Sequence, residues 1–147
     1  MCIRDRDKLI ASGDLPDIEL WIIGRWPKEI VWKRARTFPA CAGPALADLL
    51  RQCHGYITAS RWEPGGMHYI EGLQCGLPIA FHEDGGGIPE LATRYGVSFR
   101  ENLVEAVKSL VTNYAQHRAK LLSKPPSGEG MCLAYRDIVQ RVLAERL

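Results

Sequence analysis

Five short runs of strand-forming residues alternate with helix-forming segments along this chain, and this alternation limits its fold more than any other feature. The runs cover residues 18–24, 36–40, 55–60, 77–81 and 97–99. They are short, rich in β-branched or aromatic residues, and mostly bounded by Gly or Pro, which favours strands over helices. Strands that alternate with helices predict a parallel sheet with helices on both faces, which is a Rossmann-like three-layer α/β domain.

Helical segments fill the gaps between these runs. Pro44 suits the first turn of a helix that reaches about Gln52. A second helix is expected from about Met67 to Cys75, because Gly76 after it suits the left-handed position that ends many helices. A short helix is expected over residues 89–95.

The last third of the chain is helical by its pattern. Asn102, with Glu105 three residues later, is typical of a capped helix start. One apolar stripe at helical spacing continues from there to Leu122. Pro and Gly then break the helix over residues 125–128, and a final amphipathic helix follows, with its apolar positions at Leu133, Ile138, Val142 and Leu143.

Composition and charge exclude several classes of protein. The chain is 46% apolar and 24% charged, with a net charge of +2, so it is expected to fold and shows no basic excess for nucleic acid. No apolar run approaches the 18 residues of a membrane span. The number of cysteines is odd and no CxxC pair occurs, which predicts free thiols and a cytoplasmic location; the five are Cys2, Cys41, Cys53, Cys75 and Cys132.

The first residues carry little information about the fold. Residues 1–6 are polar and lack the apolar core of a signal peptide. They are interpreted as a translated adapter remnant, with a frayed native terminus as the alternative. Residues 1–8 are therefore set aside, and residues 9–147 are taken as one domain. If the start is a remnant, the natural chain continues upstream.

The richest segment for chemistry is residues 60–72. Gly65 and Gly66 let the backbone approach a ligand closely, and the free N–H groups of the helix that starts near Met67 favour a phosphate. Glu71 lies one turn into this helix, and its side chain leans back toward the same ligand, where a carboxylate accepts ribose hydroxyls well. Glu63 lies in the loop and can reach the other end of the ligand. This arrangement predicts a nucleotide-sugar site.

The stretch YITASRWEPGGMHYIEGLQCGLPIAFHEDGGGIPEL, residues 56–91, resembles a known enzyme family. It is similar to the C-terminal, donor-binding half of GT-B glycosyltransferases, and most of all to the large retaining family with a Glu-x7-Glu signature (group 1, family 4-like). Glu63 and Glu71 occupy the two glutamate positions. A glutamate pair at this spacing means little alone, and the specificity comes from its surroundings. The further matches are Gly76 and Pro78 of a Gly-x-Pro motif, and Gly86, Gly87 and Glu90 of a Gly-Gly-x-x-Glu motif.

The resemblance implies a role for each predicted site residue. Glu63 is expected to act at the donor sugar as the catalytic residue, and Glu71 to hold the ribose hydroxyls. The N–H groups of Gly65, Gly66 and Met67 are expected to meet the transferred sugar or the pyrophosphate. Such enzymes work without a metal, so no cofactor is expected beyond the nucleotide-sugar donor.

The same resemblance implies a partner domain. A GT-B active site is a cleft between two domains, so an N-terminal acceptor domain is expected as the partner of this donor-binding half. On this interpretation the chain alone is inactive. No nucleic acid and no membrane are expected among its partners.

The sequence departs from the family pattern at two places. Gly65 replaces the family's usual aromatic residue. The family also carries a basic pair after the first strand of this domain, and Arg25 and Lys28 resemble it only superficially. The stretch from Gly24 to Ser60 is too short for residues 18–24 to be the first strand of the domain, and it fits the second strand better. The strand with the basic pair is therefore expected upstream, and Arg25 and Lys28 are interpreted as solvated loop charges.

Other candidates are weaker. His68 is expected to pack rather than to act as a base, and Trp62 either stacks on a ligand or covers the end of the sheet. Residues 85–87 are expected to turn the chain near the donor, and Glu83 and Asp84 to form a polar loop edge. No metal site is expected, because no ligand spacing links the four histidines, which are His54, His68, His82 and His117.

Two other classes of function remain as alternatives. One is a non-catalytic nucleotide-binding module of the same fold. The other is a different enzyme with two carboxylates, either a glycoside hydrolase or a sugar-nucleotide epimerase, although an epimerase would lack this glutamate pair. The nucleotide that protects the fold from heat, if there is one, would discriminate between these alternatives.

Overall fold

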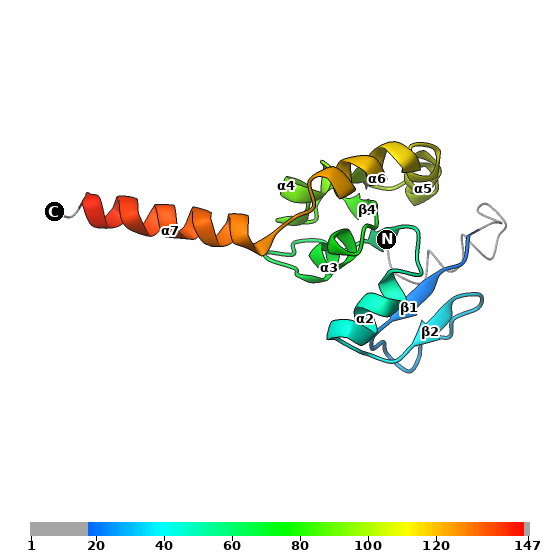
Figure 1. The fold of residues 1–147 in the computed structure, drawn as a ribbon. Coiled ribbons are helices and arrows are strands. Elements are labelled where there is room, and N and C mark those ends of the chain that lie inside the picture. Colours follow the sequence, from blue (N-terminus) through cyan, green and yellow to red (C-terminus); the bar gives the residue numbers. More distant parts are fainter. Residues whose placement is uncertain (1–17, 146–147) are drawn as a thin grey trace.

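The computed structural model describes residues 18–145, so the predictions for residues 1–8 and for Cys2 lie outside the described part. The strands are β1 (Trp21–Ile23), β2 (Arg36–Phe38), β3 (Tyr56–Thr58), β4 (Ile79–His82) and β5 (Gly96–Phe99). The helices are α2 (Gly43–Leu50), α3 (His68–Gln74), α4 (Ile88–Ala92), α5 (Leu103–Thr112), α6 (Tyr114–Ser123) and α7 (Gly128–Ala144) (Figure 1).

All five predicted strands are present and all pair in parallel, but they form two ladders rather than one. β1 pairs with β2, and β3, β4 and β5 pair in that order. The doubly wound fold has the strand order 3-2-1-4-5-6. The order β2-β1 is compatible with positions 3-2 of that fold, and β3-β4-β5 with positions 4-5-6. Within residues 18–145, no strand pairs with both ladders.

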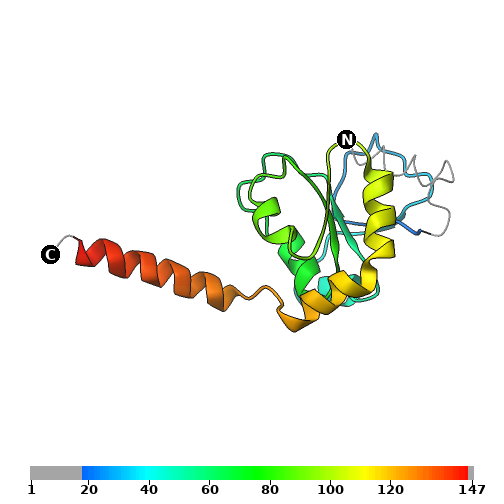
Figure 2. The same ribbon diagram turned by 90° about the horizontal axis from the view of Figure 1, so that it is seen from above.

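Helices cover both faces of the three-stranded sheet, which confirms the predicted three layers (Figure 2). All four residues of β4 are buried. Ile79 and Phe81 pack on one face beneath α3 and α4, together with Leu121 of α6. Ala80 packs on the other face, against apolar residues of α5. The sheet therefore has a hydrophobic layer on each side, and β4 contributes to both.

The predicted helix ends are largely confirmed. Pro44 lies in the first turn of α2, and Gly76 takes a φ of +83° just after α3. The side chain of Asn102 accepts a hydrogen bond from the N–H of Glu105 at 3.1 Å, as the capping pattern predicts. Each of these signals acts within one turn of the chain, so they do not depend on the rest of the fold.

The apolar stripe from Leu103 to Leu122 belongs to two helices, and the prediction of one stripe along a single helix is wrong. α5 ends and α6 begins at Asn113, whose side chain donates to the carbonyl of Ser109 at 3.0 Å. Asn favours such local bonds over a helix interior. The break lets Leu121 reach the face of the sheet opposite to the one that α5 covers.

The final helix is present as predicted, but the described residues do not cover its apolar stripe. α7 projects away from the sheet in both views (Figures 1 and 2). The large apolar side chains that it exposes are Leu133, Tyr135, Ile138, Val139, Val142 and Leu143. A hydrogen bond from the Gln74 side chain to the carbonyl of Pro126, at 3.4 Å, links the segment before α7 to α3.

The neighbouring residues Leu121 and Leu122 test how α6 is held. Leu121 is 1% exposed in the core and Leu122 is 60% exposed. We expect Leu121→Ala to lower the free energy of unfolding by about 2–5 kcal/mol, because it leaves a cavity among packed side chains. Leu122→Ala is the matched control and should change it by about 0.5 kcal/mol or less. Urea denaturation measures both, and equal effects would contradict this packing.

Candidate functional site

The carboxyl ends of β3, β4 and β5 lie at one edge of their sheet, because these strands are parallel. Ligands of parallel α/β sheets bind beyond this edge. The loop after β3, residues 59–67, holds four of the five predicted site residues, and Glu71 follows in α3. The loop after β4, residues 83–87, packs against it. The structure therefore brings the predicted site residues to one place.

The backbone of Glu63 is fixed by the glycine loop after β4. The N–H of Gly87 donates to the carbonyl oxygen of Glu63 at 2.9 Å. Gly86 has a φ of +67°, and a Cβ added there would overlap the carbonyl oxygen of Glu63 and lie 2.8 Å from its nitrogen. The two loops therefore touch through their backbones, with no room for a side chain at position 86. The glycine loop turns the chain against Glu63, which is itself half-buried.

The residue before Glu63 is strained. Trp62 has a φ of 60°, a left-handed conformation that is uncommon for a bulky side chain. Its N–H donates to the carbonyl of Asp84 at 2.9 Å, and this bond holds the strained turn in place. The Trp62 side chain is 78% exposed, so it does not cover the end of the sheet. Stacking on a ligand stays a prediction.

The start of α3 presents free backbone donors. Met67 precedes the first helical residue, and it accepts hydrogen bonds from Ile70 and Glu71. Within residues 18–145, no acceptor bonds the N–H groups of Gly65, Gly66 or Met67. Glu71 is exposed in the first turn of the helix. One surface thus carries a carboxylate and several unpaired N–H groups.

His68 packs against Tyr56 near the two predicted glutamates, and a packing role was expected for it. Its Nδ1 lies 3.1 Å from the Tyr56 hydroxyl, and the two rings stack with their centroids 6.1 Å apart. Burial lowers the pKa of His68, and the nearby carboxylates of Glu63 and Glu71 act in the opposite direction. Nε2 is buried and has no hydrogen-bond partner among the described residues. His68 is therefore a neutral packing residue that lies close to both glutamates.

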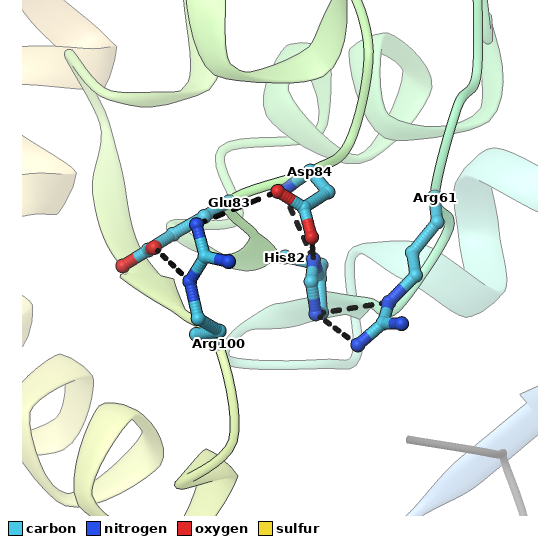
Figure 3. A network of polar contacts seen from close by, with 5 residues as sticks. All are labelled: Arg61, His82, Glu83, Asp84 and Arg100. Carbon is cyan, nitrogen blue, oxygen red and sulfur yellow. Dashed lines mark hydrogen bonds and ion pairs between the residues drawn. The ribbon is translucent and has the colours of Figure 1, made fainter.

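A polar network joins the ends of all three strands (Figure 3). Arg61, after β3, directs Nε and Nη2 at Nε2 of His82, at 3.1 and 2.9 Å. The backbone nitrogen of Asp84 lies 3.0 Å from Nδ1 of His82. Arg100, after β5, forms ion pairs with Glu83 at 3.0 Å and with Asp84 at 3.5 Å. The predicted polar loop edge at residues 83 and 84 is thus one part of a larger network.

His82 is held in its neutral form. Its side chain is 0% exposed and its ring contacts Phe99 edge-on. Burial lowers the pKa of His82 and the Arg61 guanidinium lowers it further, against a smaller opposing effect of Asp84. Both ring nitrogens face N–H groups, but a neutral imidazole accepts at only one nitrogen and a doubly protonated ring accepts at neither. The tautomer with its proton on Nδ1 leaves Nε2 to accept from Arg61. Protonation would therefore break the contact with Arg61.

Sequence reasoning missed Arg61, His82 and Arg100 as a group. These residues follow or end three different strands, and only the parallel register brings them together. One local signal existed, since the histidine ends the strand Ile-Ala-Phe-His, which is otherwise apolar and buried. A polar side chain at the end of such a strand needs partners.

The structure also bears on the loop charges, possible metal ligands, membrane-spanning helices and the cysteines. Arg25 and Lys28 are exposed in the loop after β1, as expected of solvated charges. Within residues 18–145, no three His, Cys, Asp or Glu side chains are grouped so that they could hold a metal ion. Over the same residues, none of the helices has both the length and the apolar character needed to cross a membrane. Among the residues that the structure describes, the cysteines are free thiols, as predicted, and these are Cys41, Cys53, Cys75 and Cys132.

Gly86 tests how the Glu63 loop is held. We expect Gly86→Ala to lower the free energy of unfolding by about 1–3 kcal/mol, because Ala is strained at this φ and its Cβ would displace the backbone of Glu63. Gly65→Ala is the control, since a Cβ there has nothing within 4 Å, and we expect a change of about 0.5 kcal/mol or less. Urea denaturation measures the difference. A Gly86→Ala protein as stable as the wild type would rule out this close contact.

The lowered pKa of His82 predicts that the folded protein loses stability in acid. The pKa of His82 is lower in the folded state than the ordinary value of about 6.5, so the unfolded chain binds a proton more readily. Stability is therefore greatest above about pH 6.5 and falls as the pH drops toward the folded pKa of His82. His68 and His117 add to this slope with the same sign. Urea denaturation across this range should show a shallower slope for His82→Gln, and an unchanged slope would contradict the assignment.

Comparison with known proteins places the fold and the family. Residues 8–125 match the family described as Glycosyl transferases group 1. Among solved structures, the chain is similar to sucrose-phosphate synthase from Thermosynechococcus elongatus, with a TM-score of 0.67 and 16% identity. That match covers 95% of this chain and 42% of the synthase, so this chain spans less than half of the synthase's length. No match was found among curated proteins.

At this identity the structural match shows the fold alone, which is one Rossmann-like half of a GT-B fold. The match to the family covers most of the chain and both predicted glutamates. The chain therefore belongs to the group 1 glycosyltransferase family.

Proposed function

We propose that this chain binds a nucleotide sugar and supplies the donor-binding half of an enzyme that transfers the sugar to an acceptor. One observation carries the proposal. At the carboxyl ends of the strands, Glu63 and Glu71 both lie close enough to His68 to act on its charge, and the backbone N–H groups of Gly65, Gly66 and Met67, between the two glutamates in the chain, have no acceptor among the described residues. Membership in the group 1 glycosyltransferase family supports this function for such an arrangement.

Each group has a separate role in the proposal. The exposed carboxylate of Glu71 accepts hydrogen bonds from the two ribose hydroxyls, because an ionised carboxylate has two acceptor oxygens. The N–H groups of Gly65, Gly66 and Met67 face the phosphates or the transferred sugar. Glu63 stands next to the donor sugar and stabilises the positive charge that develops on it as the phosphate departs.

The proposal does not need a metal ion. By resemblance to other GT-B enzymes, backbone N–H groups and basic side chains neutralise the charge on the departing phosphate. Fixed donors of this kind stabilise a transition state because they are already oriented when the charge develops. Nucleotide binding is therefore expected to survive a chelator: calorimetry of the wild type with UDP, GDP and ADP should give the same affinity with and without EDTA, and loss of binding in EDTA would contradict the proposal.

Glu71 tests the ribose contact. We expect Glu71→Ala to weaken binding of the nucleotide by about 10- to 100-fold, because it removes hydrogen bonds to a charged group. Calorimetry with UDP, GDP and ADP first identifies the nucleotide that the wild type binds. Glu105→Ala is the matched control, since Glu105 is also an exposed glutamate in the first turn of a helix, and its affinity should match the wild type. Unchanged affinity in Glu71→Ala would refute the ribose assignment.

A second variant separates the sugar from the nucleotide. Glu63→Gln should weaken binding of the nucleotide sugar and leave binding of the free nucleotide unchanged, because the proposal places Glu63 next to the sugar alone. If the wild type binds both ligands equally and Glu63→Gln changes neither, a non-catalytic nucleotide-binding module becomes the better interpretation.

A further inference from the structure

The guanidinium of Arg61 is held in one orientation by a buried partner. Its Nε and Nη2 lie 3.1 and 2.9 Å from Nε2 of His82, whose side chain is 0% exposed. An arginine side chain loses several rotatable bonds of freedom when it is fixed in this way. His82 is itself fixed between Phe99 and the backbone of Asp84. Arg61 is therefore oriented before any ligand arrives.

The charge of Arg61 is not neutralised by the protein. The two carboxylates of the neighbouring loop, Glu83 and Asp84, form their ion pairs with Arg100. No carboxylate within residues 18–145 pairs with Arg61, whose partner is a neutral imidazole. A guanidinium that points at a neutral ring keeps its full positive charge. The three strand ends thus carry one neutralised arginine and one with its charge free (Figure 3).

The remaining donors of Arg61 suit an oxyanion. His82 occupies the edge of the guanidinium formed by Nε and Nη2. The edge formed by Nη1 and Nη2 stays available, and its two parallel N–H groups match two oxygens of a phosphate. Arg61 is exposed at the carboxyl end of β3, two residues before Glu63. This is where parallel α/β sheets bind their ligands.

We propose that Arg61 binds a phosphate group of the nucleotide-sugar donor, and that His82 is the positioning residue that holds it. The inference rests on the proposed function for the identity of the donor. Arg61 then supplies a positive charge at the carboxyl edge of the sheet, beside the loop that carries Glu63.

This arrangement makes phosphate binding sensitive to pH. The groups that face His82 are the Arg61 guanidinium, the backbone and carboxylate of Asp84, the backbone of Arg100 and the ring of Phe99. When His82 gains a proton, Nε2 no longer accepts from Arg61, and the guanidinium is released. Affinity for the phosphate therefore falls as the pH drops, and this fall depends on both residues.

Calorimetry on the full chain tests the proposal with three probes. These are the nucleoside diphosphate that the wild type binds, the matching nucleoside and inorganic pyrophosphate. We expect Arg61→Ala to weaken diphosphate and pyrophosphate binding by roughly 10-fold or more and to leave nucleoside binding unchanged. Arg94→Ala is the control, since Arg94 is also exposed but lies at the end of α4, and it should bind all three probes like the wild type.

His82 variants test the positioning role. We expect His82→Ala to lose most of the phosphate affinity, and His82→Gln to retain it, because the Gln carbonyl oxygen can accept from Arg61 and does not titrate. As the pH drops from above the ordinary histidine pKa of about 6.5 toward the lowered pKa of His82, the wild type should lose phosphate affinity more steeply than His82→Gln or Arg61→Ala. The ligand's own ionisation is common to all three proteins.

The outcomes separate this inference from the proposed function. Equal losses for nucleoside and diphosphate in Arg61→Ala would show a merely structural role and overturn the phosphate contact. If the wild type binds no nucleotide, the proposed function fails. In that case, pyrophosphate binding that depends on Arg61 would still support an anion site. Pyrophosphate binding that does not depend on Arg61, or no pyrophosphate binding at all, would overturn this site as well. Circular dichroism of every variant confirms that it folds.

Discussion

Burial of β4 on both faces is the constraint on which the rest of the structure depends. A strand with no water on either side must satisfy its backbone groups through its neighbours, and β4 does so with β3 on one edge and β5 on the other. This pairing fixes the register of all three strands. Because they are parallel, it also fixes which residues meet at their carboxyl ends. That register determines where Glu63, the glycine loop after β4, and Arg61 and Arg100 lie.

The two arginines at the strand ends, Arg100 and Arg61, differ in whether a carboxylate neutralises their charge. Arg100 lies between two carboxylates, so its charge is balanced and its contacts are structural. Arg61 lies against an uncharged ring that is completely buried, so its position is fixed while its charge is left for a ligand. The loop that carries Glu63 is tied to the same region by backbone hydrogen bonds from Trp62 and Gly87. The geometry of the candidate site is thus inherited from the sheet rather than from flexible side chains.

Much of the fold could be predicted from the sequence because its signals are local. The strand-forming runs, the proline that starts α2, the asparagine cap of α5 and the glycine that ends α3 each act within a few residues. The break at Asn113 could not be predicted, because the apolar spacing continues through it and only the packing of Leu121 on the opposite face requires a turn. The separation into two ladders also depends on contacts that no local pattern encodes.

The candidate site also contains residues that local sequence could predict and residues that it could not. Glu63 and Glu71 could be found from their spacing and surroundings, since both lie in one continuous stretch. Their roles toward a ligand remain predictions. The network of Arg61, His82 and Arg100 could not be found, because its members belong to three separate strand ends and meet only after the sheet has formed.

The exposed final helix has a consequence for how the molecule unfolds. α7 has 17 residues, and all of its side chains that the structure describes are exposed, so its stability comes mainly from its own backbone hydrogen bonds. An isolated helix of this length is only marginally stable in water and melts gradually, whereas a packed sheet melts cooperatively. Heating should therefore first erode helical signal over a broad range while the sheet persists. Amide hydrogens of α7 should exchange with solvent long before those of β4, because the helix and the sheet are not expected to unfold together.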